Sequence, residues 1–192
     1  MILILNILSL YGFPSGISGS LGVHRTIEAL KHAFAVKMNL GDPEYVNISA
    51  AFSDMMSVSF AKELKKTIYD NMTFSPGHYG GRWNQIHDHG TSHISVIDRE
   101  CNAVSMTSTA ISKGSSNVPP PAPANFIRPG KRSLTSMSPT IVLMDGRLKA
   151  VIGASGGGMI TAGTTEVFLN HFAKGMDPFS SVISPRFYHH VH

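Results

Sequence analysis

A glycine–threonine pair, Gly90–Thr91, precedes the alternating apolar run Ile94–Asp98, and acidic and imidazole side chains surround the pair. A threonine hydroxyl is a poor nucleophile until a base removes its proton. A chain cut between Gly90 and Thr91 would give Thr91 a free α-amino group, whose pKa of about 8 suits a base near neutral pH. The pair raises the hypothesis of an N-terminal threonine hydrolase. Because Gly–Thr pairs are common, the pair alone is weak evidence for such a hydrolase.

Four side chains that can bind metal ions crowd the same stretch: His87, Asp88, His89 and His93. Zinc and other transition metals favour imidazole and carboxylate ligands. These four, however, have neither the i, i+4 spacing of a helical site nor a second ligand cluster. The favoured interpretation is a set of hydrogen-bonding histidines, and we expect no metal and no other cofactor.

A glycine-rich run, Gly153–Gly158, is expected to join a strand to a helix. The run lacks the Gly-Lys-Ser/Thr ending of a phosphate loop and the glycine spacing of a dinucleotide site. Its unhindered backbone N–H groups at a helix N-terminus would suit an oxyanion or a carboxylate. A tight strand-to-helix turn explains the run equally well, and the spacing does not separate the two interpretations.

The strand after Thr91 is expected to pair with a second strand through a turn at Asp98–Asn102. Centring this turn on Glu100 pairs residues whose numbers sum to 200, so that Ile94 faces Met106 and apolar meets apolar. A slip of one residue would set apolar against polar side chains. The same register places Thr91 opposite Thr109, on the other face of the hairpin. Two threonine hydroxyls are therefore expected to meet at its open end.

The remaining elements follow from hydrophobic periodicity and turn residues. A Ser- and Pro-rich linker covers Ile111–Asn125, and a tight hairpin turn is expected at Asp145–Gly146. The expected helices and strands are Met1–Leu10, Leu21–Met38, Ser57–Tyr69, Ile141–Met144, Arg147–Ile152 and Ile160–Lys174.

Composition bounds the class of protein. The chain has 192 residues, 42% hydrophobic and 15% charged, which is typical of a globular protein with one core. The net charge of +4 is modest and the basic residues are scattered without interleaved aromatic residues, so we expect no nucleic-acid partner. The single cysteine, Cys101, excludes an internal disulfide. The apolar segment Met1–Leu10 is too short for a membrane span and lacks the features of a signal peptide, so it is expected to be a buried helix.

Several motifs are spread over nearly the whole chain: Ile27-Glu-Ala-Leu-Lys-His-Ala-Phe, Leu40-Gly-Asp-Pro, Asp88-His-Gly-Thr-Ser-His-Ile-Ser, Asn102-Ala-Val-Ser-Met-Thr-Ser-Thr, Pro121-Ala-Pro-Ala-Asn-Phe-Ile, Ser133-Leu-Thr-Ser-Met-Ser-Pro-Thr-Ile-Val-Leu, Gly153-Ala-Ser-Gly-Gly and Pro185-Arg-Phe-Tyr-His-His. Together these motifs resemble the γ-glutamyltranspeptidases, also called glutathione hydrolases. The motif that begins at Pro121 looks most like the plant members.

The resemblance implies an α+β fold, part of the αββα sandwich of N-terminal-nucleophile hydrolases. It implies that the chain cuts itself between Gly90 and Thr91. Residues 1–90 would then be the C-terminal part of a large chain and residues 91–192 a shortened small chain, within one domain. Thr91 would take the γ-glutamyl group of glutathione or a related compound and pass it to water or an amino acid.

The resemblance also implies roles for residues beyond the nucleophile. Thr109 would hydrogen-bond the nucleophile, in agreement with the hairpin register. Thr135 and Ser136 would hold the α-carboxylate of the substrate, with Thr135 at a position where the family usually has serine. Gly156 and Gly157 would supply N–H groups to the oxyanion. Relatives in plants lie outside the cell or in the vacuole, although this chain shows no signal of its own.

The sequence departs from the family pattern in several places. Ile111 stands where the family has a substrate-binding asparagine. A segment whose acidic residues bind the α-amino group of the substrate is absent. Most of the large chain is also absent, including an arginine that pairs with the α-carboxylate, and so are the final strands. Each loss removes a charge-assisted contact of about 1.5–3 kcal/mol. The alternative interpretation is therefore a truncated, non-catalytic relative.

Overall fold

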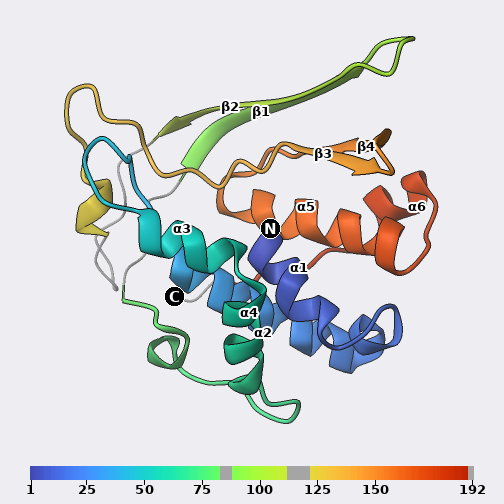
Figure 1. Ribbon diagram of the computed structural model, residues 1–192, viewed down its shortest axis with the longest axis horizontal. Coiled ribbons are helices and arrows are strands. Elements are labelled where there is room, and N and C mark those ends of the chain that lie inside the picture. Colours follow the sequence, from blue (N-terminus) through green and yellow to red (C-terminus); the bar gives the residue numbers. More distant parts are fainter. Residues whose placement is uncertain (83–87, 112–121, 190–192) are drawn as a thin grey trace.

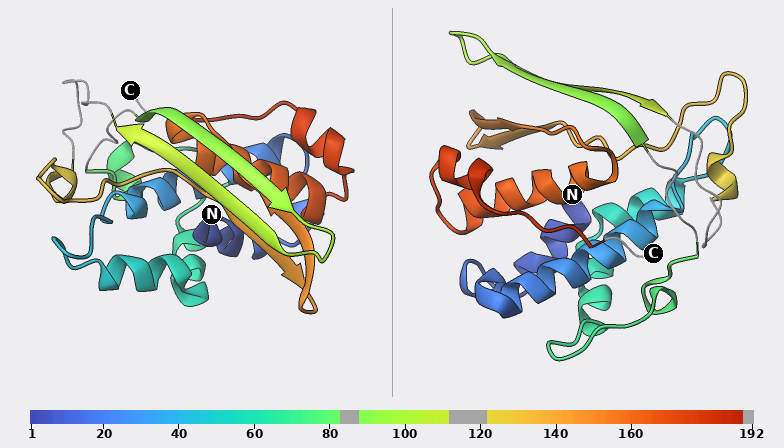
Figure 2. Two further views of the ribbon diagram at one scale, coloured as in Figure 1. Left: turned by 90° about the horizontal axis from the view of Figure 1, so that it is seen from above. Right: turned by 180° about the vertical axis from the view of Figure 1, so that it is seen from behind.

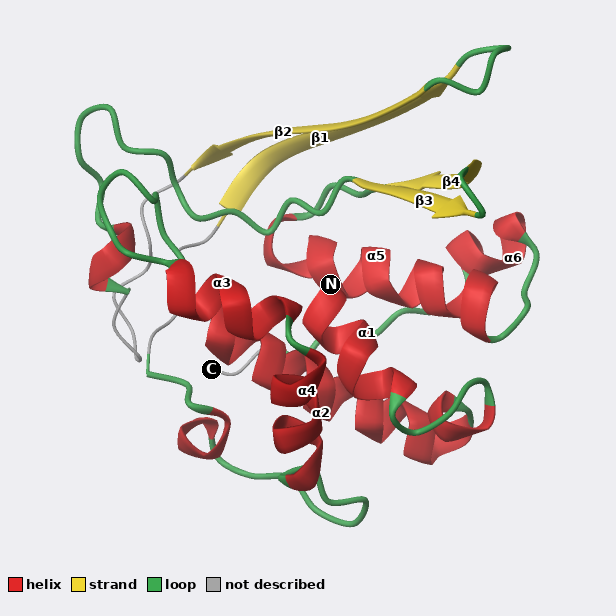
Figure 3. Cartoon of the chain, viewed as in Figure 1, coloured by secondary structure: helices red, strands yellow, loops and turns green. Residues whose placement is uncertain are grey.

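Two β-hairpins are stacked over a group of helices in the computed structural model, which describes residues 1–82, 88–111 and 122–189 (Figure 1). Figure 3 separates the helical part from the strands and loops. The α-helices are α1 (Ile2–Ser9), α2 (Gly19–Lys37), α3 (Ser49–Met56), α4 (Val58–Lys66), α5 (Ile160–Phe168) and α6 (Pro178–Ile183). The strands are β1 (Asp88–Ile97), β2 (Ala103–Ile111), β3 (Thr140–Met144) and β4 (Arg147–Ile152).

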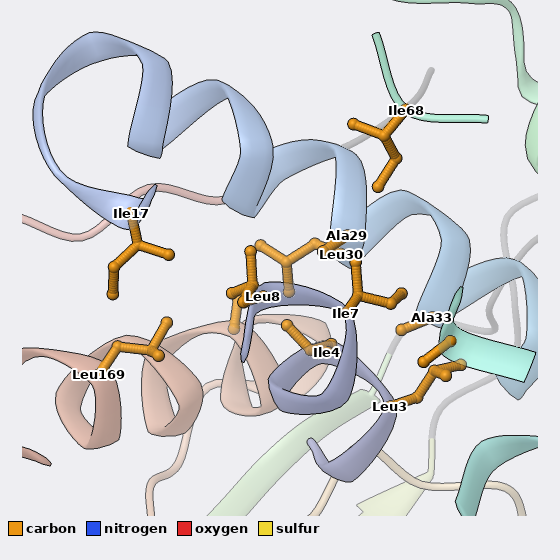
Figure 4. Packing of buried hydrophobic residues seen from close by; sticks show 12 residues of the cluster. Leu3, Ile4, Ile7, Leu8, Ile17, Ala29, Leu30, Ala33, Ile68 and Leu169 are labelled. Atoms are coloured by element: carbon orange, nitrogen blue, oxygen red, sulfur yellow. The ribbon is translucent and has the colours of Figure 1, made fainter. Parts of the chain in front are cut away.

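The hydrophobic core is built around α1. Leu3, Ile4, Ile7 and Leu8 of this helix are all buried, and their spacing places them on one face of the helix (Figure 4). Helices α2 and α4 pack against α1, and Leu169, the first residue after α5, belongs to the same cluster. The prediction that Met1–Leu10 forms a buried helix is confirmed.

The two hairpins have the predicted turns. Residues of β1 and β2 pair with numbers that sum to 200 from Ser92 onward, as Ile94 with Met106 shows. In the second hairpin Asp145 and Gly146 both have left-handed backbones, with φ of 53° and 72°, the conformation that a two-residue type I′ turn requires. The alternation of apolar residues and the turn chemistry therefore predicted both pairings.

The hairpins form two β layers. Strands β1 and β2 lie over β3 and β4, and the helices lie on the far side of β3 and β4 (Figure 2). In the described ranges no helix covers the outer face of β1 and β2, where Ile94, Val104 and Met106 are 50, 54 and 58% exposed. The α+β class and the stacked sheets are thus as expected, and the described residues form a partial sandwich with helices on one side.

Two of the helices were not predicted, and one predicted helix ends in a different conformation. Helix α3 buries none of its residues and α6 is a single short segment, so neither has an apolar stripe to read. The predicted helix from Ile160 ends in a π-helical turn, η5 (Leu169–Ala173), closed by the Lys174 N–H donating to the Leu169 carbonyl at 2.9 Å. In the parts of the chain described by the structure, no helix combines the length and apolar content needed to span a bilayer.

Candidate active site

The hydroxyl groups of Thr91 and Thr109 meet at the open end of the first hairpin, with their oxygen atoms 2.7 Å apart. A β-bulge brings them together, because the register shifts between His89 and Ser92 so that Gly90 and Thr91 both lie opposite Thr109. Gly90 has the left-handed φ of 81° that a bulge of this kind requires at its first position, which favours glycine. The Gly90–Thr91 pair therefore forms the bulge that directs the Thr91 hydroxyl toward Thr109.

A polar face continues from the two threonines along the hairpin. His93 is hydrogen-bonded through Nδ1 to the Thr107 hydroxyl at 2.8 Å and through Nε2 to the Ser95 hydroxyl at 2.9 Å. The Ser105 hydroxyl donates to the carbonyl of Ile152 in β4 at 3.2 Å. This face is thus turned toward the second hairpin, and the apolar face is turned away from it.

The glycine run forms a tight turn between β4 and α5. Gly156 and Gly157 have φ of 125° and 59°, and a short 3-10 helix, η4 (Gly157–Met159), leads into α5. This short helix packs against β1, the strand that carries Thr91. The structure thus places the run in a strand-to-helix turn beside β1, the strand that carries Thr91. Whether Gly156 and Gly157 bind an oxyanion stays a prediction.

The loop before β3 carries Thr135 and Ser136. Ser136 is 1% exposed, and its hydroxyl accepts a hydrogen bond from the Lys37 ammonium group at 2.6 Å. The Thr161 hydroxyl of α5 donates to the Ser136 carbonyl at 3.1 Å. The Thr135 hydroxyl accepts the backbone N–H of Met137 at 3.1 Å. Lys37 and α5 therefore hold Ser136 in one position.

An ion pair anchors the start of that loop. The buried carboxylate of Asp42 accepts hydrogen bonds from the backbone N–H of Arg132 and from its guanidinium group, both at 2.7 Å. The same guanidinium group reaches Glu44 at 2.8 Å. The hydrogen bonds from Arg132 hold the pKa of Asp42 well below its usual range. Asp42 thus remains a carboxylate and ties the loop to the segment after α2.

The model of the gamma-glutamyltranspeptidase family matches residues 1–120 and 110–192, which together are the whole chain. The chain belongs to the gamma-glutamyltranspeptidase family. Glutathione hydrolase 2 of Arabidopsis thaliana is 58% identical to all of this chain, which covers 38% of that protein. Glutathione hydrolase 3 of the same plant is 41% identical over 98% of this chain and 34% of that protein. The chain therefore spans little more than a third of these two relatives.

A third relative in this family has a different length. Glutathione hydrolase 4 of Arabidopsis thaliana, whose name carries the word "inactive", is 57% identical over 80% of this chain and 95% of that protein. Among solved structures, a mutant gamma-glutamyltranspeptidase of Helicobacter pylori is 32% identical to this chain. The superposition covers 50% of this chain and 66% of that one, with a TM-score of 0.44.

Sequence reasoning did not find two residues beside the family motifs. Lys37 lies in the last turn of α2, and Arg132 lies directly before the predicted substrate loop. Their partners Ser136 and Asp42 are 99 and 90 residues away, so no local pattern signals either contact. Both residues position the loop that the family resemblance singles out.

The four candidate metal ligands do not form a cluster among the side chains that the structure describes. His87 lies outside the described residues, as do the side chains of Asp88 and His89. His93 is engaged with Thr107 and Ser95 instead. The interpretation of His93 as a hydrogen-bonding histidine therefore agrees with the structure.

A cavity of about 670 Å³ lies between β4, the glycine turn, α5 and α6. Its walls include Ile152, Val167 and Phe187, and the buried carboxyl group of Glu166. Thr91, Thr109, Thr135 and Ser136 are not part of its lining. The cavity therefore borders the glycine turn, and its lining includes neither the two threonines of the first hairpin nor the two residues of the loop before β3.

Proposed function

We propose that this chain is the catalytic part of a γ-glutamyltransferase or glutathione hydrolase, and that Thr91 becomes its nucleophile after the chain cuts itself between Gly90 and Thr91. Residues 1–90 and 91–192 are then two chains of one domain. The substrates are glutathione and related γ-glutamyl compounds, and the acceptor is water or an amino acid.

The observation that carries this proposal is the 2.7 Å contact between the Thr91 and Thr109 hydroxyls. A hydroxyl held by a second hydroxyl has a fixed direction and a partner for its proton. The bulge at Gly90 supports the proposal, because the peptide bond between Gly90 and Thr91 adjoins that pair. Membership of the family and the 58% identity to a glutathione hydrolase support the same assignment.

Self-cleavage would start with attack of the Thr91 oxygen on the carbonyl carbon of Gly90. The new C–O bond forms as the peptide C–N bond breaks, and the nitrogen of Thr91 takes the proton that the hydroxyl loses. Water then hydrolyses the ester, which leaves a carboxylate on Gly90 and restores the Thr91 hydroxyl. The product has a free α-amino group on the nucleophile residue, which is the base that the hydroxyl needs.

Turnover would repeat the same chemistry on the substrate. The α-amino group of Thr91 accepts the hydroxyl proton while the oxygen attacks the γ-glutamyl carbonyl carbon, and the proton passes to the leaving amine. N–H groups of Gly156 and Gly157 would stabilise the negative oxygen of the tetrahedral intermediate. Water or an amino acid then attacks the glutamyl ester and frees the Thr91 hydroxyl.

A second candidate is a non-catalytic relative. Ile111 ends β2 where the family has a substrate-binding asparagine, and the acidic segment expected after Thr109 is absent from the sequence. The relative whose name carries the word "inactive" is matched over 95% of its length, unlike the two longer relatives. These observations favour weak substrate binding rather than loss of the nucleophile.

The test is a γ-glutamyl anilide assay combined with the intact mass of the protein. We expect release of the aniline. We also expect the fragment that begins at Thr91 to have a mass that is larger by one glutamyl group. Thr91→Ala abolishes both signals, whereas Ser92→Ala, which changes an exposed neighbour on the opposite face, keeps them. Aniline release that survives in Thr91→Ala would refute the nucleophile assignment. A cut chain without aniline release would favour the second candidate.

A further inference from the structure

His93 lies at the contact between the two hairpins. It is two residues after Thr91 in β1, and its ring is hydrogen-bonded to Thr107 and Ser95. The ring faces Gly153, the first residue after β4. A β-carbon placed on Gly153 would lie 1.9 Å from Cε1 of His93, 2.2 Å from Nε2 and 2.4 Å from Nδ1. The ring therefore occupies the space that any side chain at this position would fill.

Gly153 does not need to be glycine for its backbone conformation, since it is outside the left-handed region. What requires glycine here is the close approach of the histidine ring. The Ser105 hydroxyl bonds the carbonyl of Ile152, the preceding residue, at 3.2 Å, which fixes the same junction from β2. The two contacts join the polar face of the first hairpin to the beginning of the glycine turn.

Gly153 begins the turn that contains Gly156 and Gly157, while His93 lies on the strand that carries Thr91. We propose that His93 is a positioning residue, whose ring, seated on Gly153, sets the spacing between Thr91 and the glycine turn. This inference rests on the proposed function, in which Thr91 attacks a carbonyl whose oxygen the glycine turn receives. A displacement of about 1 Å in such an arrangement can cost about 100-fold in rate.

The hydrogen bonds of His93 distinguish positioning from proton transfer. Both ring nitrogens are engaged, one with Thr107 and one with Ser95, at 2.8 and 2.9 Å. A general base must lie within hydrogen-bond reach of the proton that it removes. The ring nitrogens of His93 bond Thr107 and Ser95, whereas the Thr91 hydroxyl is bonded to Thr109. His93 is therefore assigned a role through its shape and its fixed orientation, and the α-amino group of Thr91 remains the base.

The contact itself is tested by a double-mutant cycle on thermal unfolding. Gly153→Ala alone lowers the melting temperature by about 5 °C, because its methyl group overlaps the ring. In the His93→Ala background the ring is gone, and Gly153→Ala changes the melting temperature by less than about 1 °C. Equal losses in both backgrounds would show that the ring does not occupy this space, and would overturn the inference.

The positioning role is tested by the rate of aniline release from a γ-glutamyl anilide in folded protein, below the melting temperature of every variant. His93→Ala slows this release about 10- to 100-fold without changing the pH dependence of the rate. The control is His24→Ala, which removes a histidine on α2 that is bonded to the Tyr69 carbonyl. An unchanged rate in His93→Ala, or a pH profile that loses one titration, would overturn the positioning role.

A second measurement separates this inference from the proposed function. In protein with ¹³C-methyl-labelled threonine, the NMR signals of Thr91 and Thr109 shift in His93→Ala and stay in place in His24→Ala. This measurement needs no cleavage. If the native chain is never cut, the proposed function fails while the methyl shifts still decide on the contact. Unmoved Thr91 and Thr109 signals would overturn the positioning role of His93.

Discussion

Glu166 makes the stability of this protein depend on pH in a predictable way. The residue lies in α5 and is 5% exposed. One carboxyl oxygen accepts the Phe187 N–H at 3.1 Å, and the other has no hydrogen-bond partner among the described residues. Burial raises the pKa of Glu166 from 4.5 to about 7, against the smaller opposing effect of the Phe187 N–H. The folded protein therefore holds a proton that the unfolded chain releases at lower pH.

The sign and the magnitude follow from this difference. The contribution of protonated Glu166 to stability is complete below pH 4.5 and is lost as the pH rises through about 7. A difference of about 2.5 pH units between 4.5 and about 7, at 1.36 kcal/mol per unit, corresponds to about 3 kcal/mol. Glu166→Gln stays neutral and keeps an oxygen for the Phe187 N–H. Its free energy of unfolding should exceed that of the native protein by a margin that grows by about 3 kcal/mol between pH 4.5 and 8.

The assay is urea unfolding followed by circular dichroism at several pH values from 4.5 to 8. The native protein and Glu166→Gln are compared at each pH, so that contributions from other titrating groups cancel. Glu63→Gln is the control, because Glu63 is exposed and forms a surface ion pair with Lys66. Parallel curves for Glu166→Gln and the native protein would show that Glu166 is ionised in the fold, and would refute the reasoning.

Three further predictions concern the hydrogen bond between Thr91 and Thr109, the ion pair between Asp42 and Arg132, and the core. Thr109→Val removes one hydrogen bond of about 1 kcal/mol and should slow cleavage before Thr91 about 5-fold, measured on a gel time course; an unchanged rate would contradict it. Asp42→Asn should destabilise the protein at neutral pH. The pKa of Asp42 is lower in the folded protein than in the unfolded chain, so its carboxylate stabilises the fold above pH 3.8. The loss should therefore shrink as the pH falls below 3.8, and a loss that is constant with pH would contradict this. Ile7→Ala should cost about 2–5 kcal/mol in urea unfolding, and Ile2→Ala, at a half-exposed position of the same helix, less than about 1 kcal/mol; equal costs would contradict the placement of α1.

The local parts of the fold were predictable because local rules determine them. The register of β1 and β2 follows from the alternation of apolar residues and the length of one turn. The Asp145–Gly146 turn follows from its two residue types. Helix α1 follows from a continuous apolar segment that must be buried. In each case neighbouring residues carry the whole signal.

The non-local parts of the candidate site were not predictable in the same way. The register places Thr91 opposite Thr109, but the bulge that joins them depends on the backbone of Gly90, which the register does not reveal. The bond between Lys37 and Ser136 links residues that are far apart in the chain. The packing of His93 on Gly153 needs both hairpins in place. Family motifs predict roles for Thr135 and Ser136, and the structure shows the groups that hold their loop.

The outer face of the first hairpin shows the limit of the alternation rule. Alternation predicts which residues share a face, and Ile94, Val104 and Met106 do share one. Alternation does not predict whether another layer of the fold covers that face. In the described residues the helices pack under β3 and β4, and this apolar face is exposed.

The central claim is that Thr91 is a nucleophile released by cleavage after Gly90. The most direct measurement is the intact mass of the purified chain after incubation at neutral pH, together with N-terminal sequencing of the fragments. The account predicts two fragments, residues 1–90 and a second that begins at Thr91, and their absence in Thr91→Ala. A native chain that stays uncut, or one that is cut equally in Thr91→Ala, would contradict it.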